Sequence, residues 1–191
     1  VQWLRDGLGL IGASSEIGPL AESIPDTEGV MLVPAFTGLG SPWWDPYARG
    51  TIVGITRGAG RAHFARAAVE AMAYQTRDAV DAMSAAAGTP IVGLRVDGGA
   101  SVMPLLLQLQ ADQIGVPVAR PAVEETTALG AAYLAGLAEG VWGSLDEVTD
   151  NWVLDTEVTP SNTDDRTAAD AAFASWHRAV QRSRAWATDP L

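Results

Sequence analysis

The sequence predicts an α/β fold, and three observations lead to that prediction. Short β-branched segments alternate with longer amphipathic segments from residue 30 onward. A glycine pair stands between one predicted strand and the helix that follows it. The chain has 191 residues, 48% hydrophobic and 18% charged, which is globular composition with enough apolar surface for a core. Together these features indicate about one domain, with helices packed against a parallel sheet.

The first 29 residues are predicted to hold one helix followed by a loop. Residues 1–11 carry apolar side chains spaced for one helical face. No capping residue precedes Val1, so we expect the chain to begin inside a helix of a longer protein. Residues 12–29 are polar and contain glycine and proline, which favours a loop.

Two strands and a long helix are predicted next. Residues 30–36 and 51–55 are the strands, and the glycine- and proline-rich segment 37–50 joins them. Residues 61–87 have an alanine-rich apolar stripe at helical spacing, so this helix can lie close to a sheet. Gly88 follows directly and is expected to end it.

The second half continues the alternation of strands and helices. The predicted elements are strand 91–97, helix 102–114, strand 116–120, helix 126–140 and a last helix over 164–187. Residues 141–160 are expected to be irregular apart from one short helical turn at SLDEV.

The composition excludes several classes of function. The net charge is −11, so nonspecific binding to nucleic acid or anionic lipid is disfavoured. All 12 basic residues are Arg, so no lysine can grip a phosphate or form a Schiff base. There is no Cys, and His63 and His177 are the only histidines, which excludes thiolate and multi-histidine metal sites within the chain. No long apolar run or signal peptide is visible, and we expect a cytoplasmic protein.

The motif VDGGAS at residues 96–101 is the strongest local signal for chemistry. Gly98 and Gly99 leave the backbone open to close approach at a strand-to-helix turn. The N-terminus of the following helix suits a phosphate group. The alternative is a tight turn with no ligand, and Asp97 either holds this turn or faces the metal of a nucleotide.

The remaining candidates favour structural roles. The loop TGLGSPWWDP either faces a substrate or packs on its own domain through its tryptophans, and packing is the favoured interpretation. His63 is interpreted as a surface residue at a helix N-terminus, and His177 as a packing residue. The acidic pairs at 124–125, 146–147 and 164–165 are interpreted as solvated loops and helix starts. The residues by themselves give no complete catalytic set.

Several strings taken together resemble one family. The segment VPAFTGLGSPWWDPYARGTIVGITRG resembles the FGGY carbohydrate kinases, in particular the branch that phosphorylates glycerol. Residues 50–70 are similar to the family's second signature. The strings AYQTRDAVDAM, LRVDGGAS, LLLQLQAD and ETTALGAAYLAGLAEG follow in the family's order. The resemblance covers residues 1–150 strongly and the final helix loosely.

The resemblance implies an actin/ribonuclease-H-like fold, with a mixed sheet flanked by helices and incomplete at its N-terminal strands. Residues 1–191 would be the C-terminal, nucleotide-binding domain. The family's catalytic aspartate and most polyol contacts would lie before Val1, so neither a catalytic residue nor a metal ligand is assigned here. The implied reaction transfers a phosphoryl group from ATP, with Mg²⁺, to glycerol and gives sn-glycerol 3-phosphate. A homo-oligomer is expected, and neither nucleic acid nor a membrane is an expected partner.

The resemblance also carries over a set of nucleotide contacts. These are Gln2, Gly98, Gly99, Ala100 and Met103. Met103 is a departure from better-known relatives, which have Asn at this position. A thioether cannot donate the hydrogen bond of the amide, worth roughly 0.5–1.5 kcal/mol net, but it can pack on an adenine face. Nucleotide affinity or base selectivity is therefore expected to differ.

Missing upstream strands would leave an apolar sheet edge prone to association, so the chain alone is expected to be unstable or self-pairing and inactive. Two alternatives stay open. One is an FGGY kinase acting on a ketopentose or a sugar acid, and the other is a non-catalytic nucleotide-binding module.

Overall fold

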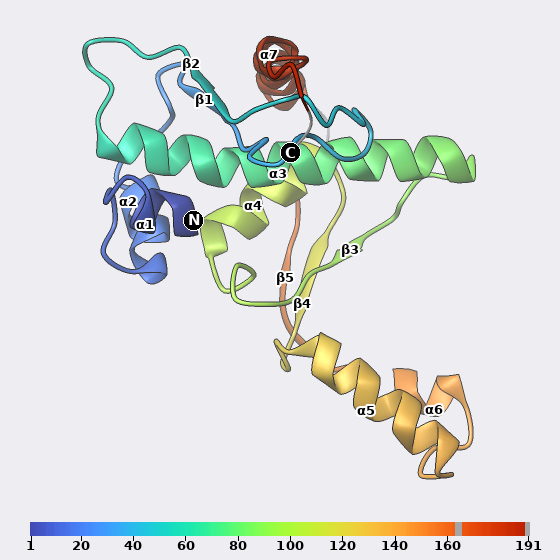
Figure 1. Ribbon diagram of the computed structural model, residues 1–191. Coiled ribbons are helices and arrows are strands. Elements are labelled where there is room, and N and C mark those ends of the chain that lie inside the picture. Colours follow the sequence, from blue (N-terminus) through green and yellow to red (C-terminus); the bar gives the residue numbers. More distant parts are fainter. Residues whose placement is uncertain (163–165, 190–191) are drawn as a thin grey trace.

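The computed structural model describes residues 1–162 and 166–189, and one long helix organises it (Figure 1). This helix, α3 (Arg61–Ala87), has the bounds that the sequence predicts. A short antiparallel pair of strands and the last helix lie on one side of α3, and the N-terminal helices and α4 lie on the other. The elements around α3 are α1 (Gln2–Asp6), α2 (Ile17–Glu22), β1 (Met31–Val33), β2 (Thr51–Val53), α4 (Pro104–Ile114) and α7 (Thr167–Ser183).

Alanine lets α3 pack closely on three sides. Ala65, Ala67, Ala71 and Ala73 are buried on it, and the small side chains allow close approach of its neighbours. The main core lies between α3, β1 and α7, where Trp176 is 1% exposed. At the C-terminal end, Gly88 adopts φ +67° and its N–H bonds to the carbonyl of Ser84, as a glycine C-cap does.

A mixed three-stranded sheet lies beyond α4. Its strands are β3 (Leu94–Arg95), β4 (Val118–Pro121) and β5 (Leu154–Val158), in the order β3-β4-β5. β3 runs parallel to β4, whereas β5 runs antiparallel to it. The expected mixed sheet is therefore confirmed, and the purely parallel sheet is wrong. β5 was missed because its residues LDTEV are mostly exposed and show no buried alternating face.

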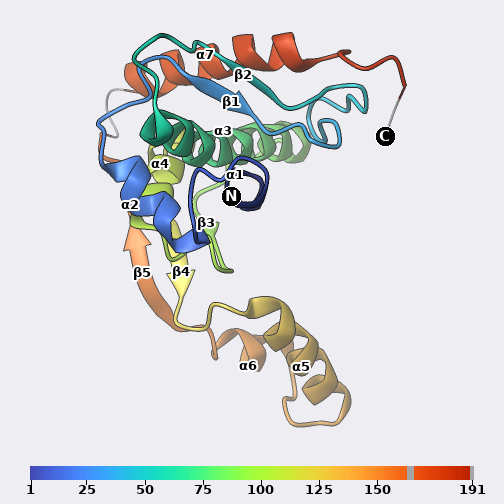
Figure 2. The same cartoon turned by 60° about the vertical axis from the view of Figure 1, so that its left-hand side comes forward.

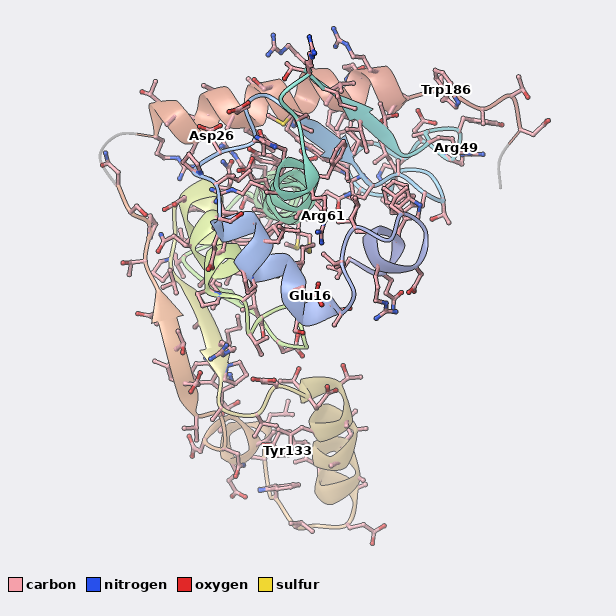
Figure 3. The ribbon with its side chains drawn as sticks, turned by 90° about the vertical axis from the view of Figure 1, so that its left-hand side faces the viewer. Glu16, Asp26, Arg49, Arg61, Tyr133 and Trp186 are labelled. Carbon is pink, nitrogen blue, oxygen red and sulfur yellow. The ribbon has the colours of Figure 1, made fainter. Side chains whose placement is uncertain are left out.

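Strands β4 and β5 lead away from the core to a small helical lobe (Figure 2). The lobe contains α5 (Thr126–Ala138) and α6 (Leu145–Thr149). Helix α5 is apolar on all sides, but among its residues only Gly136 is buried. Figure 3 shows Tyr133 in this lobe, where its ring lies edge-on to Trp142 with centroids 5.0 Å apart.

Three further sequence expectations need correction. Helix α1 ends at Asp6 and not at residue 11, because Gly7 and Gly9 follow and Gly9 adopts φ +61°. The segment 12–29 is not mainly loop: a 3-10 turn, Ser14–Glu16, leads into α2, whose Ile17 is fully buried. The strand predicted over 91–97 is reduced to two residues, Leu94–Arg95. The expected start of the last helix at residue 164 and the acidic pair 164–165 lie outside the described residues.

The loop 37–50 is held by one of its two adjacent tryptophans. The indole of Trp43 donates to Asp78 on α3 at 2.9 Å, whereas Trp44 is 75% exposed. The carboxylate of Asp45 accepts from the amides of Tyr47 and Ala48, and also from that of Ala185 after α7. These contacts agree with the packing interpretation for Trp43 and leave Trp44 free to meet another molecule.

None of the helices in the described residues combines the length and the hydropathy needed to cross a bilayer.

Candidate functional site

The glycine pair forms a tight turn between β3 and α4. Gly98 adopts φ +77°, a backbone conformation that favours glycine. Its N–H donates to the carbonyl of Glu124 at 2.9 Å. Its carbonyl accepts from both the amide and the hydroxyl of Ser101, at 3.0 and 2.7 Å, and Ser101 is 3% exposed. The turn is thus closed on its inner side by its own hydrogen bonds.

The outer side of the same turn is open. In the described part of the chain, the amides of Gly99 and Ala100 have no hydrogen-bond acceptor. A Cβ added at Gly99 would meet no heavy atom within 4 Å. The turn leads into the first turn of α4, an 11-residue helix with Met103 as its N-cap residue and Pro104 at its start. Free amides beside a helix N-terminus suit an anion such as a phosphate group.

Asp97 contacts the neighbouring lobe. The hydroxyl of Thr126, at the start of α5, donates to the carboxylate of Asp97. Of the two roles considered from the sequence, this contact corresponds to holding the turn. No group of three or more acidic or histidine side chains that could hold a metal ion occurs in the described residues.

The other two predicted nucleotide contacts, Met103 and Gln2, lie on different elements. Met103 packs beside α2, where a Cβ on Gly18 would lie 3.2 Å from the Met103 Cγ. Gln2 is exposed on α1, and no hydrogen bond within the described chain joins its side chain to the turn. Figures 1 and 2 show α1, α2 and the β3–α4 segment on the same side of α3. The structure therefore brings Gly98, Gly99, Ala100 and Met103 together, with Gln2 on the same side.

Arg120 on β4 supports this turn, a role that the sequence pattern did not predict. Its Nη1 donates to the carbonyl of Ser101 at 3.0 Å, and its Nε donates to Asp155 on β5 at 3.1 Å. The guanidinium hydrogen bond lowers the pKa of Asp155, and Thr156 adds to this effect. The signal that could have revealed Arg120 is a charged residue at the end of a predicted buried strand, where it needs a partner.

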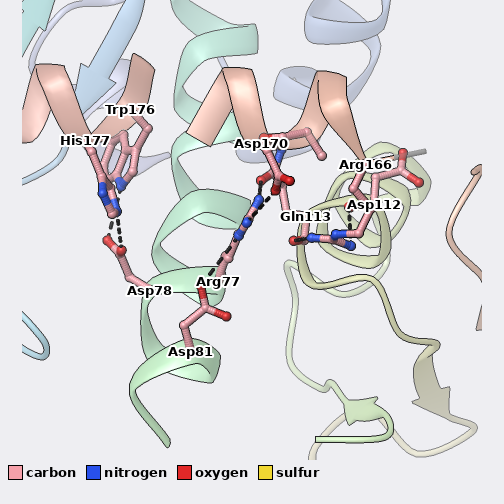
Figure 4. A network of polar contacts seen from close by, with 10 residues as sticks. Arg77, Asp78, Asp81, Asp112, Gln113, Arg166, Asp170, Trp176 and His177 are labelled. Atoms are coloured by element: carbon pink, nitrogen blue, oxygen red, sulfur yellow. Dashed lines mark hydrogen bonds and ion pairs between the residues drawn. The ribbon is translucent and has the colours of Figure 1, made fainter. Parts of the chain in front are cut away.

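A separate polar network joins α3 to α7 (Figure 4). Asp78 is 5% exposed and accepts from the indoles of Trp43 and Trp176, and His177 Nε2 lies 2.8 Å from its second oxygen. The His177 ring also packs against Phe173, with centroids 4.3 Å apart, as the packing interpretation predicts. These contacts connect segments of the core and lie on elements other than those of the glycine turn.

His63 departs from its predicted surface setting. It lies at the N-terminus of α3 as expected, but its side chain is only 14% exposed. Its Nδ1 accepts from the amide of Gly60 at 3.0 Å, and its Nε2 lies 3.7 Å from Glu28. The ring is turned inward because it caps the first turn of the helix.

A cavity of about 460 Å³ lies between α3, α4 and α7, apart from the glycine turn. Tyr74 lines it and donates to Glu70 at 3.1 Å, and burial together with the Glu70 charge raises the pKa of the Tyr74 hydroxyl. Glu70 in turn pairs with Arg66 at 2.8 Å. These polar groups are satisfied by one another, which is the pattern of a structural network.

The chain is similar to known kinases over nearly its whole length. It is 57% identical over 186 residues to a glycerol kinase of Aromatoleum aromaticum, and 58% identical over 187 residues to one of Dechloromonas aromatica. These alignments cover 97% and 98% of this chain but 37% of each relative. The chain therefore spans little more than a third of the length of these relatives.

Solved structures show the same similarity. The structure of Plasmodium falciparum glycerol kinase with ADP matches with a TM-score of 0.83 and 33% identity, covering 95% of this chain and 36% of that one. A ligand-bound xylulose kinase from Lactobacillus acidophilus matches with a TM-score of 0.75 and 25% identity, covering 93% and 36%. Residues 1–139 match the C-terminal domain of the FGGY family of carbohydrate kinases. The chain belongs to the FGGY family of carbohydrate kinases.

Proposed function

We propose that this chain is the ATP-side domain of a kinase that transfers the γ-phosphoryl group of ATP to glycerol and yields sn-glycerol 3-phosphate. The single observation that carries the proposal is the open glycine turn, where the amides of Gly99 and Ala100 point to no acceptor in the described chain. The preference for glycerol is supported by relatives named glycerol kinase at 57% and 58% identity.

The turn would bind the phosphate chain of the nucleotide. Gly98 and Gly99 bring backbone to the ligand without a side chain, Ala100 adds only a methyl group, and the N-terminus of α4 adds a partial positive charge. Backbone amides suit this task in a chain that has no lysine. Phosphoryl transfer depends mainly on such positioning and charge stabilisation.

Met103 and Gln2 would contact the adenosine end. Met103 is half-buried at the N-cap of α4, and its apolar side chain could pack against the adenine ring. Gln2 is exposed on α1 and free to donate and accept hydrogen bonds. Neither residue has a group suited to accept the proton of the glycerol hydroxyl, so neither is assigned as the catalytic base.

ATP supplies the phosphoryl group, and Mg²⁺ would neutralise its phosphates when bound. In this proposal, the chain's part is to orient the nucleotide that carries the ion. The proposal includes residues 1–191 as a single nucleotide-binding domain, a cytoplasmic location and assembly into a homo-oligomer.

The test is phosphorylation of glycerol and of alternative substrates by the natural full-length protein that contains these 191 residues. Product formation and ADP release are measured with Mg-ATP and, in turn, glycerol, dihydroxyacetone, xylulose, ribulose and gluconate. We expect a clear preference for glycerol and accumulation of glycerol 3-phosphate.

Turnover with only a pentulose or gluconate would overturn the glycerol assignment and retain the nucleotide site. Nucleotide binding without turnover of any of these compounds would instead favour a non-catalytic binding module.

A further inference from the structure

The carbonyl of Ser101 ends the glycine turn, and its partner comes from a different strand. Arg120 Nη1 donates to this oxygen at 3.0 Å, across 19 residues of sequence. Ser101 is 3% exposed, so its carbonyl has little access to water. Removing the guanidinium would leave a buried acceptor without the partner that it has in the described chain.

Asp155 accepts hydrogen bonds from the other side of the same guanidinium. Nε of Arg120 lies 3.1 Å from the Asp155 carboxylate, and Nη2 also contacts it. The Arg120 side chain is 18% exposed and that of Asp155 is 43% exposed. An ion pair with a partly exposed carboxylate contributes little to stability, so its loss is expected to leave the Arg120 bond to Ser101 in place. The planar guanidinium can bind the carboxylate and the Ser101 carbonyl at once, whereas a lysine ammonium is a point donor.

The beginning of the turn is held independently. The Gly98 amide bonds to the carbonyl of Glu124, and Asp97 accepts from Thr126. Both partners lie at the approach to α5. Arg120 therefore fixes the end of the turn, while the α5 approach fixes its start, and the amides of Gly99 and Ala100 lie between the two attachments.

We propose that Arg120 is a positioning residue for phosphate binding, because it holds the turn 98–101 in the conformation that leaves the Gly99 and Ala100 amides without an acceptor in the described chain. This inference rests on the proposed function of the turn. Arg120 acts through Ser101 and does not itself touch the nucleotide. A role confined to joining β4 and β5 would instead affect the stability of the sheet without a selective effect on ATP.

The experiment compares three variants of the natural full-length protein. Arg120→Gln removes both the charge and the contact with Ser101, and Arg120→Lys retains one donor. Asp155→Asn is the matched control, because it weakens the ion pair but leaves the Arg120 bond to Ser101 in place.

We expect Arg120→Gln to raise KM for ATP about tenfold, with kcat and KM for glycerol changed less than about twofold, since a charge-assisted hydrogen bond is lost at the turn. Arg120→Lys should give an intermediate KM for ATP, and Asp155→Asn should remain close to the parent. An unchanged KM for ATP in Arg120→Gln would overturn the proposal, and so would an equal rise in Asp155→Asn.

Amide hydrogen exchange of residues 98–102 provides a second readout that does not depend on activity. It should accelerate in Arg120→Gln and Arg120→Lys more than in Asp155→Asn. If Arg120→Gln fails to fold, KM for ATP and the amide exchange of residues 98–102 in Arg120→Lys test the positioning role instead. Inactivity of the unsubstituted protein would refute the proposed function, whereas an active parent with unchanged turn exchange in the arginine variants would refute only the positioning role.

Discussion

Asp78 on α3 accepts a hydrogen bond of 3.1 Å from the indole of Trp176 on α7, 98 residues further along the chain. The same oxygen accepts from Trp43 at 2.9 Å, and His177 contacts the other oxygen at 2.8 Å. One buried carboxylate thus connects α3 to α7 and to the loop 37–50. Its three partners compensate for its removal from water.

Substitution of Asp78 should destabilise the fold strongly. Asp78→Asn removes the buried charge that accepts from two indoles at one oxygen and contacts His177 at the other, so these hydrogen bonds lose their charge assistance and we expect a loss of about 2–4 kcal/mol. Urea unfolding of the natural full-length protein, followed by tryptophan fluorescence, measures the loss. Asp81→Asn on the same helix is the control, because the Asp81 side chain is 59% exposed and should change stability little. Equal effects of the two substitutions would contradict the assigned role of Asp78.

The proposed phosphate site predicts a selective effect at Gly99. A Cβ at this position meets no protein atom within 4 Å, and Gly99 lacks the positive φ of Gly98. Gly99→Ala should therefore leave the melting temperature unchanged while its methyl group occupies the space of the phosphates. We expect KM for ATP to rise at least about tenfold in the natural full-length protein.

Gly60→Ala is the matched control for Gly99, since its Cβ also meets no atom within 4 Å and its φ is −131°. It should leave KM for ATP near the parent value. A normal KM for ATP in Gly99→Ala would remove the turn from the nucleotide site.

Replacing Met103 should improve α4. Met103 is the N-cap residue and has no side-chain hydrogen bond to the first turn, whereas Asn is among the best N-cap residues. Met103→Asn is expected to stabilise the chain by about 0.5–2 kcal/mol through this cap, less the packing lost against Gly18. KM for ATP should fall, because an amide can donate to the nucleotide. Thermal unfolding and ATP titrations measure the two effects separately, and Met103→Leu, which keeps the apolar packing without a cap, should show neither gain.

The loop anchor Asp45 should give stability a defined dependence on pH. The Ala185 amide, followed by those of Tyr47 and Ala48 and by the charge of Arg184, lowers the pKa of Asp45 below its ordinary value of 3.8. The folded state thus favours the carboxylate. Its contribution is complete above the pKa of the unfolded chain and is lost as the pH falls through the lower, folded value.

Asp45→Asn should accordingly reduce the urea midpoint at pH 7, and the difference from the parent should shrink as the pH falls below 3.8. A difference that stays constant from neutral pH to pH values well below that point would show that the Asp45 charge contributes nothing.

The chain studied alone should self-associate. Within the described residues, β3 pairs with β4 along one edge and has no strand on its other edge. Val92 nearby is 86% exposed, and Leu134 on the apolar helix α5 is 68% exposed. Sedimentation velocity should show larger species as the concentration rises from about 1 to 100 µM, and Val92→Lys should reduce them because a charge opposes edge pairing. A monomer throughout this range, with a cooperative melt at high temperature, would contradict the expectation.

The sequence predicted the strongly periodic elements and the phosphate-suited turn. Helix α3 has the predicted bounds, since its alanine stripe and Gly88 are local signals that need no distant partner. The glycine pair lies where it was expected, between a strand and a helix, since the conformation of Gly98 depends mainly on its missing Cβ.

Tertiary structure decided the features that depend on distant partners. Strand β5 has no buried alternating pattern and exists because its backbone pairs with β4. The roles of Arg120 and Asp78 likewise follow from partners 19 to 99 residues away, which no local pattern encodes. Local propensity and periodicity are properties of short segments, so the sequence by itself determined the long helix α3, the glycine turn and the family. The satisfaction of buried polar groups is a property of the packed chain, so only the tertiary structure could show what holds that turn in place.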